Sequence, residues 1–147
     1  MAKSCYEYTI WVIGKYPKTE KELRIKMYQQ WYDSEIVNRT LEKLKQDNFV
    51  NDELFAESYI NSEVIRKWRP LLVISQKLET RGIDKAIISK VIHEAWDEIE
   101  QWIHQWIEKE IQQYKKKWVD GFDIIQKLMR KGYRLGDIKR VIKSREE

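Results

Sequence analysis

The chain has 147 residues, of which 42% are hydrophobic and 35% charged, with a formal net charge of +4 at pH 7. Its single cysteine excludes an intrachain disulfide, and no apolar run approaches the roughly twenty residues that span a bilayer. Because the start carries no signal-like apolar segment, we expect a soluble, cytoplasmic protein in which Cys5 is an inert or partly buried thiol.

Helices are expected throughout the chain. Five glycines and two prolines leave little turn chemistry for hairpins. No stretch shows sustained alternation of apolar and polar residues between turn signals. The composition therefore predicts an all-α protein.

Helix boundaries follow in chain order. Gly14 and Pro17 are predicted to end a first helix. Thr19 and Glu22 have the spacing of a capping box, which opens a second helix, and Asp33 can cap a third. These signals predict three helices within the first third of the chain.

The middle of the chain continues in the same way. Asn51 can cap a fourth helix, Pro70 suits the first position of the next, and Gly82 suits its end. Asp84 then opens another helix. From there to Trp118 no proline or glycine occurs, and we favour two helices joined near 96–97 over one long helix.

Residues 68–92 recur at 118–142, shifted by fifty positions. A fainter copy lies fifty-one positions earlier, with Trp31 at the position of Gly82. The turn of this first copy must therefore close without a glycine, the residue that enters the left-handed region freely. Such a period predicts an elongated, curved array of three tandem three-helix repeats, at 1–48, 49–95 and 96–147. The identical pairs are Trp68/Trp118, Ile74/Ile124, Gln76/Gln126, Lys77/Lys127, Leu78/Leu128, Gly82/Gly132, Ile88/Ile138, Val91/Val141 and Ile92/Ile142.

Apolar stripes at helical spacing are expected to form the core. The third helices supply Ile87, Ile88, Val91 and Ile92, and Leu135, Ile138, Val141 and Ile142. A second stripe comprises Trp102, Ile103, Trp106, Ile107, Ile111, Tyr114 and Trp118. We favour packing on neighbouring helices over a base-stacking platform for these aromatic residues, because burial of a tryptophan is strongly favourable.

Charge is unevenly distributed. Residues 94–110 carry six acids and one lysine, whereas residues 115–147 carry eleven Lys and Arg and five acids. The basic end could contact phosphates or an acidic protein surface, and either partner would give salt-sensitive association. For any single lysine, a solvated face is the better interpretation.

The sequence gives little support for an enzymatic function. The sequence lacks a glycine-rich phosphate loop, a Cys or His cluster with ligand spacing and a nucleophile-elbow serine. His93 and His104 are three helical turns apart, too far to share a metal. We therefore predict no catalytic residues, no metal site, no cofactor and no small-molecule substrate.

Several motifs lie between Thr19 and Ile92. The most specific is the run Asn-Asp-x-x-Phe-Ala-x-x-Tyr at 51–59, followed by Gln-Lys-Leu at 76–78 and Arg-Gly-Ile at 81–83. Together these motifs resemble the RecX family of recombinase regulators. The last repeat matches through Leu128, Gly132 and 141–142. The chain departs from the family where Trp68-Arg69-Pro70 replaces a common glycine before the proline.

This resemblance implies tandem three-helix repeats that bind the RecA recombinase. RecX-like proteins lie along the groove of its nucleoprotein filament, block its extension and dampen its ATP hydrolysis, strand exchange and co-protease role. This implies a part in DNA repair, recombination and the SOS response. Contacts to filament protein or to DNA phosphates would come from Arg66, Lys67, Arg69, Lys77, Arg81, Lys127, Arg130, Lys131, Arg134 and Arg140. Family-pattern residues interpreted as structural are Asp52, Phe55, Ala56, Tyr59 and Gly82.

Two alternatives remain. A helix-turn-helix transcription regulator would read a major groove with Arg134, Lys139, Arg140 and Lys143, but the third helices carry few residues placed for bidentate base contacts. A helical scaffold would bind an unrelated protein. We expect no membrane contact and a monomer, although an exposed tryptophan stripe could pair two chains.

Overall fold

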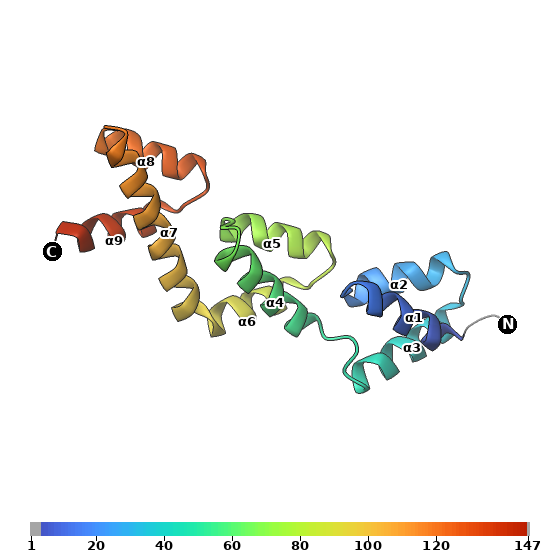
Figure 1. Ribbon diagram of the computed structural model, residues 1–147. Coiled ribbons are helices and arrows are strands. Elements are labelled where there is room, and N and C mark those ends of the chain that lie inside the picture. Colours follow the sequence, from blue (N-terminus) through green and yellow to red (C-terminus); the bar gives the residue numbers. More distant parts are fainter. Residues whose placement is uncertain (1–3, 147) are drawn as a thin grey trace. The chain divides into compact units, whose positions relative to one another are not determined.

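The computed structural model describes residues 4–146, and all regular structure in this range is α-helical (Figure 1). The prediction of an all-α protein is confirmed. No helix within residues 4–146 has the length and apolarity needed to cross a membrane. The nine helices of this range are α1 (Cys5–Lys15), α2 (Glu20–Gln29), α3 (Ser34–Gln46), α4 (Asp52–Ile65), α5 (Leu71–Thr80), α6 (Lys85–Glu94), α7 (Trp96–Lys116), α8 (Gly121–Arg130) and α9 (Leu135–Glu146).

The helix starts lie where the capping residues predict them. Thr19 and Glu22 form both hydrogen bonds of a capping box at the start of α2. Asp33 Oδ1 accepts the Ile36 backbone N–H and caps α3, and Asn51 Oδ1 accepts the corresponding N–H at the start of α4. These side chains satisfy backbone donors that have no partner within the helix.

Three boundaries differ slightly from expectation. Gly14 lies inside α1, which ends at Lys15. Pro70 precedes α5 by one residue, and its carbonyl oxygen accepts the first helical hydrogen bond, from Ile74. The segment after Asp84 forms two helices, as favoured, and the break between α6 and α7 falls at Ala95.

The repeated sequence gives a repeated turn. Trp31, Gly82 and Gly132 occupy equivalent positions after α2, α5 and α8, and all three have positive φ, at 66°, 93° and 102°. In each turn the next residue donates its N–H to a carbonyl five positions back, as Ile83 does to Leu78. The first turn therefore adopts the left-handed conformation at a tryptophan, where this conformation costs about 1 kcal/mol or more.

Packing explains why the two later turns require glycine. A Cβ built on Gly82 would lie 2.3 Å from Lys21 Cδ, and one built on Gly132 would lie 2.3 Å from Pro70 Cγ. Trp31, in contrast, is 94% exposed. The first turn therefore has room for a large side chain because this position is open to solvent.

The chain divides into two compact units, and the division runs through α4, α5 and α6. The first unit comprises Met1–Tyr59 and Gln76–Val91, and the second comprises Ile60–Ser75 and Ile92–Glu147. The residue limits of the three predicted repeats stay a prediction.

Helices α1, α2 and α3 pack on one another in the first unit (Figure 1). Their apolar faces form a cluster with partly buried tyrosines around it. Cys5 belongs to this cluster and is buried, and burial raises the pKa of its thiol, which disfavours the reactive thiolate. The buried members are Cys5, Val12, Leu23, Met27, Val37, Leu41, Leu44 and Val50.

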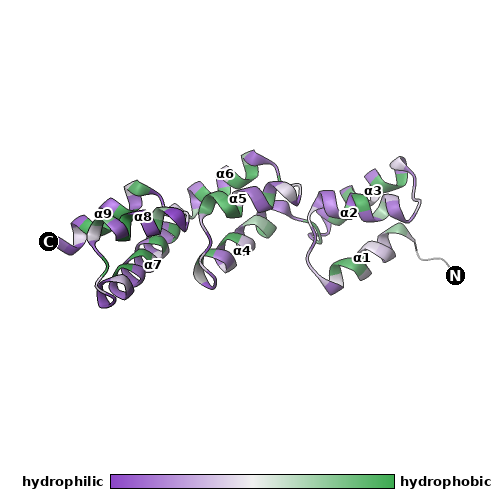
Figure 2. Ribbon diagram, turned by 90° about the horizontal axis from the view of Figure 1, so that it is seen from above, coloured by the Kyte–Doolittle hydropathy of each residue, from purple (hydrophilic) through white to green (hydrophobic). Residues whose placement is uncertain are grey.

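Helices α7, α8 and α9 pack on one another in the second unit. Each carries hydrophilic and hydrophobic stretches, as amphipathic helices do (Figure 2). Trp106 is partly buried and donates its ring N–H to the Val64 carbonyl oxygen at 2.9 Å. The buried hydrophobic residues of these helices and of the turn before α9 are Ile99, Ile103, Ile107, Ile111, Ile124, Leu128, Tyr133, Ile138 and Val141.

The prediction that all stripe residues are packed inside the protein is wrong for two of them. Trp118 is 94% exposed because α7 ends at Lys116, which leaves Trp118 in a left-handed turn beyond the helix, with φ of 62°. Leu135 is 38% exposed because it is the first residue of α9.

Candidate partner-binding surfaces

The ten cations predicted to contact a partner fall in both units. Lys77 and Arg81 belong to the first unit, and the other eight belong to the second. All are exposed except Arg81, which is partly buried. The surface of each unit is therefore considered separately.

An aromatic stack in the second unit brings two basic segments together. The rings of Trp68 and Tyr133 lie 4.2 Å apart between centroids, with an angle of 9° between their planes. Gly132 lies against Pro70 in the same region. Six cations flank the two stacked aromatic residues along the chain, and we name these six the cationic cluster. Its members are Arg66, Lys67, Arg69, Arg130, Lys131 and Arg134.

Half of this cationic cluster is paired with acids. Lys67 and Arg69 lie 3.8 and 3.6 Å from the buried Glu63 carboxylate. Lys131 Nζ lies 2.6 Å from Glu110 Oε2, and this hydrogen bond raises the pKa of Lys131.

Within residues 4–146, no acidic side chain is recorded within 4 Å of Arg66, Arg130 or Arg134. These three guanidinium groups remain available to an anionic partner.

The two remaining cations of the second unit differ in the contacts that they make within the protein. Arg140 contacts Glu100 at 3.0 Å and Asp137 at 2.6 Å, so its guanidinium is engaged within the protein. Lys127 Nζ lies 6.0 Å from the centre of the Tyr114 ring, at the limit of a cation–π contact. Arg140 is thus a weaker candidate for a partner contact than the unpaired arginines.

Arg81 is held in place within the first unit. Its Nε and Nη2 donate to the two oxygens of Glu22 at 3.2 and 3.0 Å, and its guanidinium lies 4.5 Å from the Phe55 ring centre. Burial pushes the pKa of Glu22 up, but hydrogen bonds from the Thr19 N–H and from Arg81 outweigh it and hold the pKa below its usual value. The Thr19 hydroxyl also donates to the Arg81 carbonyl oxygen at 2.6 Å.

Residues of the 51–59 motif make structural contacts in the first unit. Asp52 Oδ1 accepts the Glu20 backbone N–H at 3.0 Å, and burial raises the pKa of this carboxyl. Ala56 is fully buried. Phe55 and Tyr59 stack with their centroids 6.2 Å apart. The interpretation of the motif as a helix start with a packing face stays a prediction.

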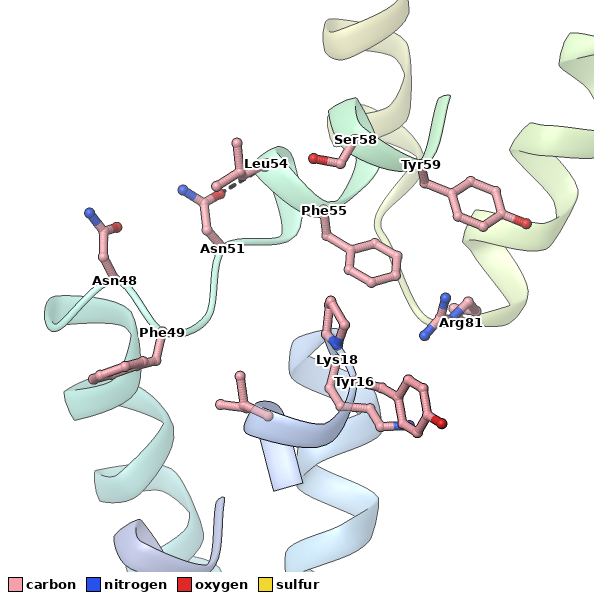
Figure 3. A pocket seen from close by; sticks show the side chains of 12 residues that line it. Tyr16, Lys18, Asn48, Phe49, Asn51, Leu54, Phe55, Ser58, Tyr59 and Arg81 are labelled. Atoms are coloured by element: carbon pink, nitrogen blue, oxygen red, sulfur yellow. Dashed lines mark hydrogen bonds between the residues drawn. The ribbon is translucent and has the colours of Figure 1, made fainter. Parts of the chain in front are cut away.

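A groove in the first unit was not foreseen from the sequence. It has a volume of about 650 Å³. Figure 3 shows Phe55 pointing from α4 toward the segment that carries Tyr16 and Lys18, with Arg81 beside it. Aromatic residues near the helix ends could have indicated a groove, but these segments were used only to place helix boundaries. The groove is lined by Ile13, Tyr16, Pro17, Lys18, Asn48, Phe49, Asn51, Leu54, Phe55, Ser58, Tyr59 and Arg81.

Metal coordination finds no support in the part of the chain that the structure describes. No group of three or more His, Cys, Asp or Glu side chains there could hold a metal ion. The two histidines lie on different helices, His93 on α6 and His104 on α7.

Comparisons with known proteins agree on one family. The family model for the second three-helix domain of RecX matches residues 51–92. Regulatory protein RecX of Clostridium perfringens (strain SM101) is 31% identical over 134 residues, which are 88% of this chain and 62% of that protein. Regulatory protein RecX of Streptococcus sanguinis is 28% identical over 125 residues, which are 83% of this chain and 48% of that protein.

The chain thus spans between about half and about three fifths of the length of these relatives. A crystal structure of RecX from Lactobacillus salivarius shares the fold, with a TM-score of 0.80 at 21% identity, over 95% of this chain and 93% of that one. From the sequence identity, the matched domain and the shared fold, we conclude that this chain belongs to the RecX family.

Proposed function

We propose that this protein is a cytoplasmic regulator that binds the nucleoprotein filament of the RecA recombinase and inhibits its extension and ATP hydrolysis. The observation that carries this proposal is the 31% identity to a regulatory protein RecX over 88% of the chain. The protein acts by binding rather than by catalysing a reaction, and it needs no cofactor.

The cationic cluster supports an anionic partner of this kind. A filament of protein on DNA presents phosphates and acidic side chains, which attract cations over several ångströms at moderate salt. Arg66, Arg130 and Arg134 can form bidentate hydrogen bonds to either group, since no acid of the described chain engages them. On this proposal these three arginines are the residues of the second unit that contact the filament first.

One observation weighs against a helix-turn-helix regulator. Such a factor would read bases with side chains of the last helix, but Arg140 on α9 is bound to Glu100 and Asp137. A guanidinium engaged by two carboxylates has to break these contacts before it can form a bidentate contact to a guanine. The filament-binding proposal requires no such exchange.

A titration of ATP hydrolysis tests the proposal. RecA on single-stranded DNA is mixed with increasing amounts of the protein. We expect hydrolysis to slow at fewer molecules of this protein than of RecA, because blocking extension at a filament end affects many protomers. Unchanged hydrolysis at saturating protein would refute the proposal. Selective retention of one duplex sequence over competitor DNA at physiological salt would favour the transcription regulator instead.

A further inference from the structure

We infer that the groove of the first unit receives an apolar side chain flanked by a carboxylate, presented by the protein component of the filament. This inference rests on the proposed function and deepens it, because it assigns to the partner's protein surface a contact separate from the cationic cluster. Its support comes from the groove's size, its rigid walls and its charge.

The groove exposes several large apolar side chains around one hollow. Tyr16 is 70% exposed, Leu54 57% and Phe49 48%, and they come from three separate segments of the chain. Their gathering around a hollow of about 650 Å³ matches the volume of known binding sites. A hollow of this volume with mostly apolar walls and a few polar groups is typical of a binding site.

The walls of the groove are held before any partner arrives. Arg81 is fixed by two hydrogen bonds to Glu22 and lies over the ring of Phe55, which stacks in turn with Tyr59 (Figure 3). Side chains that are already ordered lose little conformational entropy when they bind. The groove is therefore ready to receive a side chain without rearrangement.

The charge of the groove selects the occupant. Among the described residues, its lining contains Lys18 and Arg81 and no acidic residue. Glu22 forms an ion pair with Arg81 and attracts Lys18 more weakly, since no carboxylate of the described chain is recorded within 4 Å of Lys18, so the two cations together keep an excess of one positive charge. One available ammonium group at the edge of an apolar hollow complements a carboxylate beside an apolar side chain. A nucleic-acid backbone would need several such cations.

Leu54→Glu tests the groove with little risk to the fold. Leu54 is the third residue of α4, and its N–H is capped by Asn51 Oδ1. A glutamate at this position completes a capping box, so the helix start is retained. Ile25→Glu is the matched control, because Ile25 is 47% exposed on α2 of the same unit and does not line the groove.

Binding is measured by fluorescence anisotropy of the labelled protein on RecA filaments, which are assembled on single-stranded DNA with a non-hydrolysable ATP analogue. We expect Leu54→Glu to weaken binding by about tenfold, as burial of a hot-spot side chain predicts, and Ile25→Glu to bind like wild type. Lys18→Glu should weaken binding more than Lys85→Glu, since Lys85 is exposed in the same unit but lies outside the groove.

The outcomes separate the two proposals. If wild type binds the filament and Leu54→Glu binds as tightly, the groove inference is overturned and the proposed function stands. If Leu54→Glu and Ile25→Glu weaken binding equally, the groove inference is also overturned. If wild type binds single-stranded DNA without RecA and Leu54→Glu does not, the groove is a nucleic-acid surface and the inference is overturned. Absence of wild-type binding to the filament would remove the proposed function itself.

Discussion

Trp68 stacks on Tyr133 with nearly parallel rings, and the Tyr133 hydroxyl is buried without a hydrogen-bond partner in the described part of the chain. The ring contributes burial and stacking energy, whereas the hydroxyl loses its hydrogen bonds to water on folding. Burial accordingly raises the pKa of Tyr133. The two parts of this side chain have opposite effects on stability.

Tyr133→Phe should therefore stabilise the protein or leave it unchanged, because it removes a buried polar group that costs about 1 kcal/mol when unsatisfied. Tyr133→Ala should cost about 3–5 kcal/mol through the lost ring. Urea denaturation followed by circular dichroism measures both values.

Tyr6→Phe is the control for the hydroxyl. Tyr6 Oη donates to Asp47 Oδ2 at 2.7 Å, so its removal should lower the free energy of unfolding by up to about 1 kcal/mol. A destabilisation of Tyr133→Phe as large as that of Tyr6→Phe would indicate that the Tyr133 hydroxyl has a partner.

The equivalent turns after α2, α5 and α8 predict opposite effects of substitution. Gly82→Ala should destabilise by about 1–3 kcal/mol, since φ of 93° disfavours a Cβ that would also lie 2.4 Å from Lys21 Cβ. Trp31→Gly should stabilise by up to about 1 kcal/mol, because it relieves a left-handed tryptophan that packs on little. Thermal unfolding measures both changes.

Gly136→Ala provides the control for these turns. A Cβ built on Gly136 would have no heavy atom of residues 4–146 recorded within 4 Å, and the residue lies near the start of α9. Alanine is favoured over glycine within a helix by about 1 kcal/mol, so this substitution should stabilise the protein. If Gly82→Ala stabilised it equally, the close packing against Lys21 would not exist in solution.

Local signals in the sequence predicted most of the fold. Caps such as Thr19 and Asp33 were readable because the bonds that they form span three residues. The repeat offset predicted equivalent turns, since the same residues recur in them. Trp118 was misplaced because its spacing continues the stripe of α7 beyond Lys116, where the helix ends.

The candidate surfaces depended on distant contacts and were less readable. Sequence marked the cations near Trp68 and Tyr133 but not the stack that joins them, because helical periodicity does not pair residues of different helices. It also did not reveal that Glu22 engages Arg81, or that Tyr16, Phe49 and Leu54 line one groove. Such pairings emerge only when the helices are packed.

The Glu22 carboxylate should make stability depend on pH. Its folded-state pKa lies below its usual value, so its ion pair with Arg81 stabilises the protein above the unfolded-state pKa and is lost as the pH falls through the folded-state pKa. Glu22→Gln should cost about 1 kcal/mol at pH 7 and much less below about pH 4.

Denaturation at pH 7 and pH 3 measures this difference. Glu35→Gln is the control, because Glu35 is 83% exposed and lies 3.9 Å from Arg39, and its substitution should change stability by less than about 0.5 kcal/mol at either pH. A cost of Glu22→Gln that stayed constant down to pH 3 would contradict the lowered pKa.

The unpaired arginines of the cationic cluster should contribute most to filament binding. Reversing Arg130 and Arg134 to glutamate leaves the Lys131 contact with Glu110 intact, so the fold should be retained. We expect binding to weaken by about tenfold at moderate salt, and by less as the salt concentration rises, because screening reduces the contribution of exposed charges.

The control is the double substitution of Lys139 and Lys143 by glutamate, which changes the net charge by the same amount as the arginine double variant. Both lysines are exposed on α9 and lie outside the cationic cluster. Long-range attraction alone would make the two double variants equally weak, whereas direct contact at the cluster makes the arginine variant weaker, because bidentate hydrogen bonds are lost as well as charge. Equal affinities across a salt titration, with unchanged helicity, would move the contact surface away from the Trp68 and Tyr133 stack.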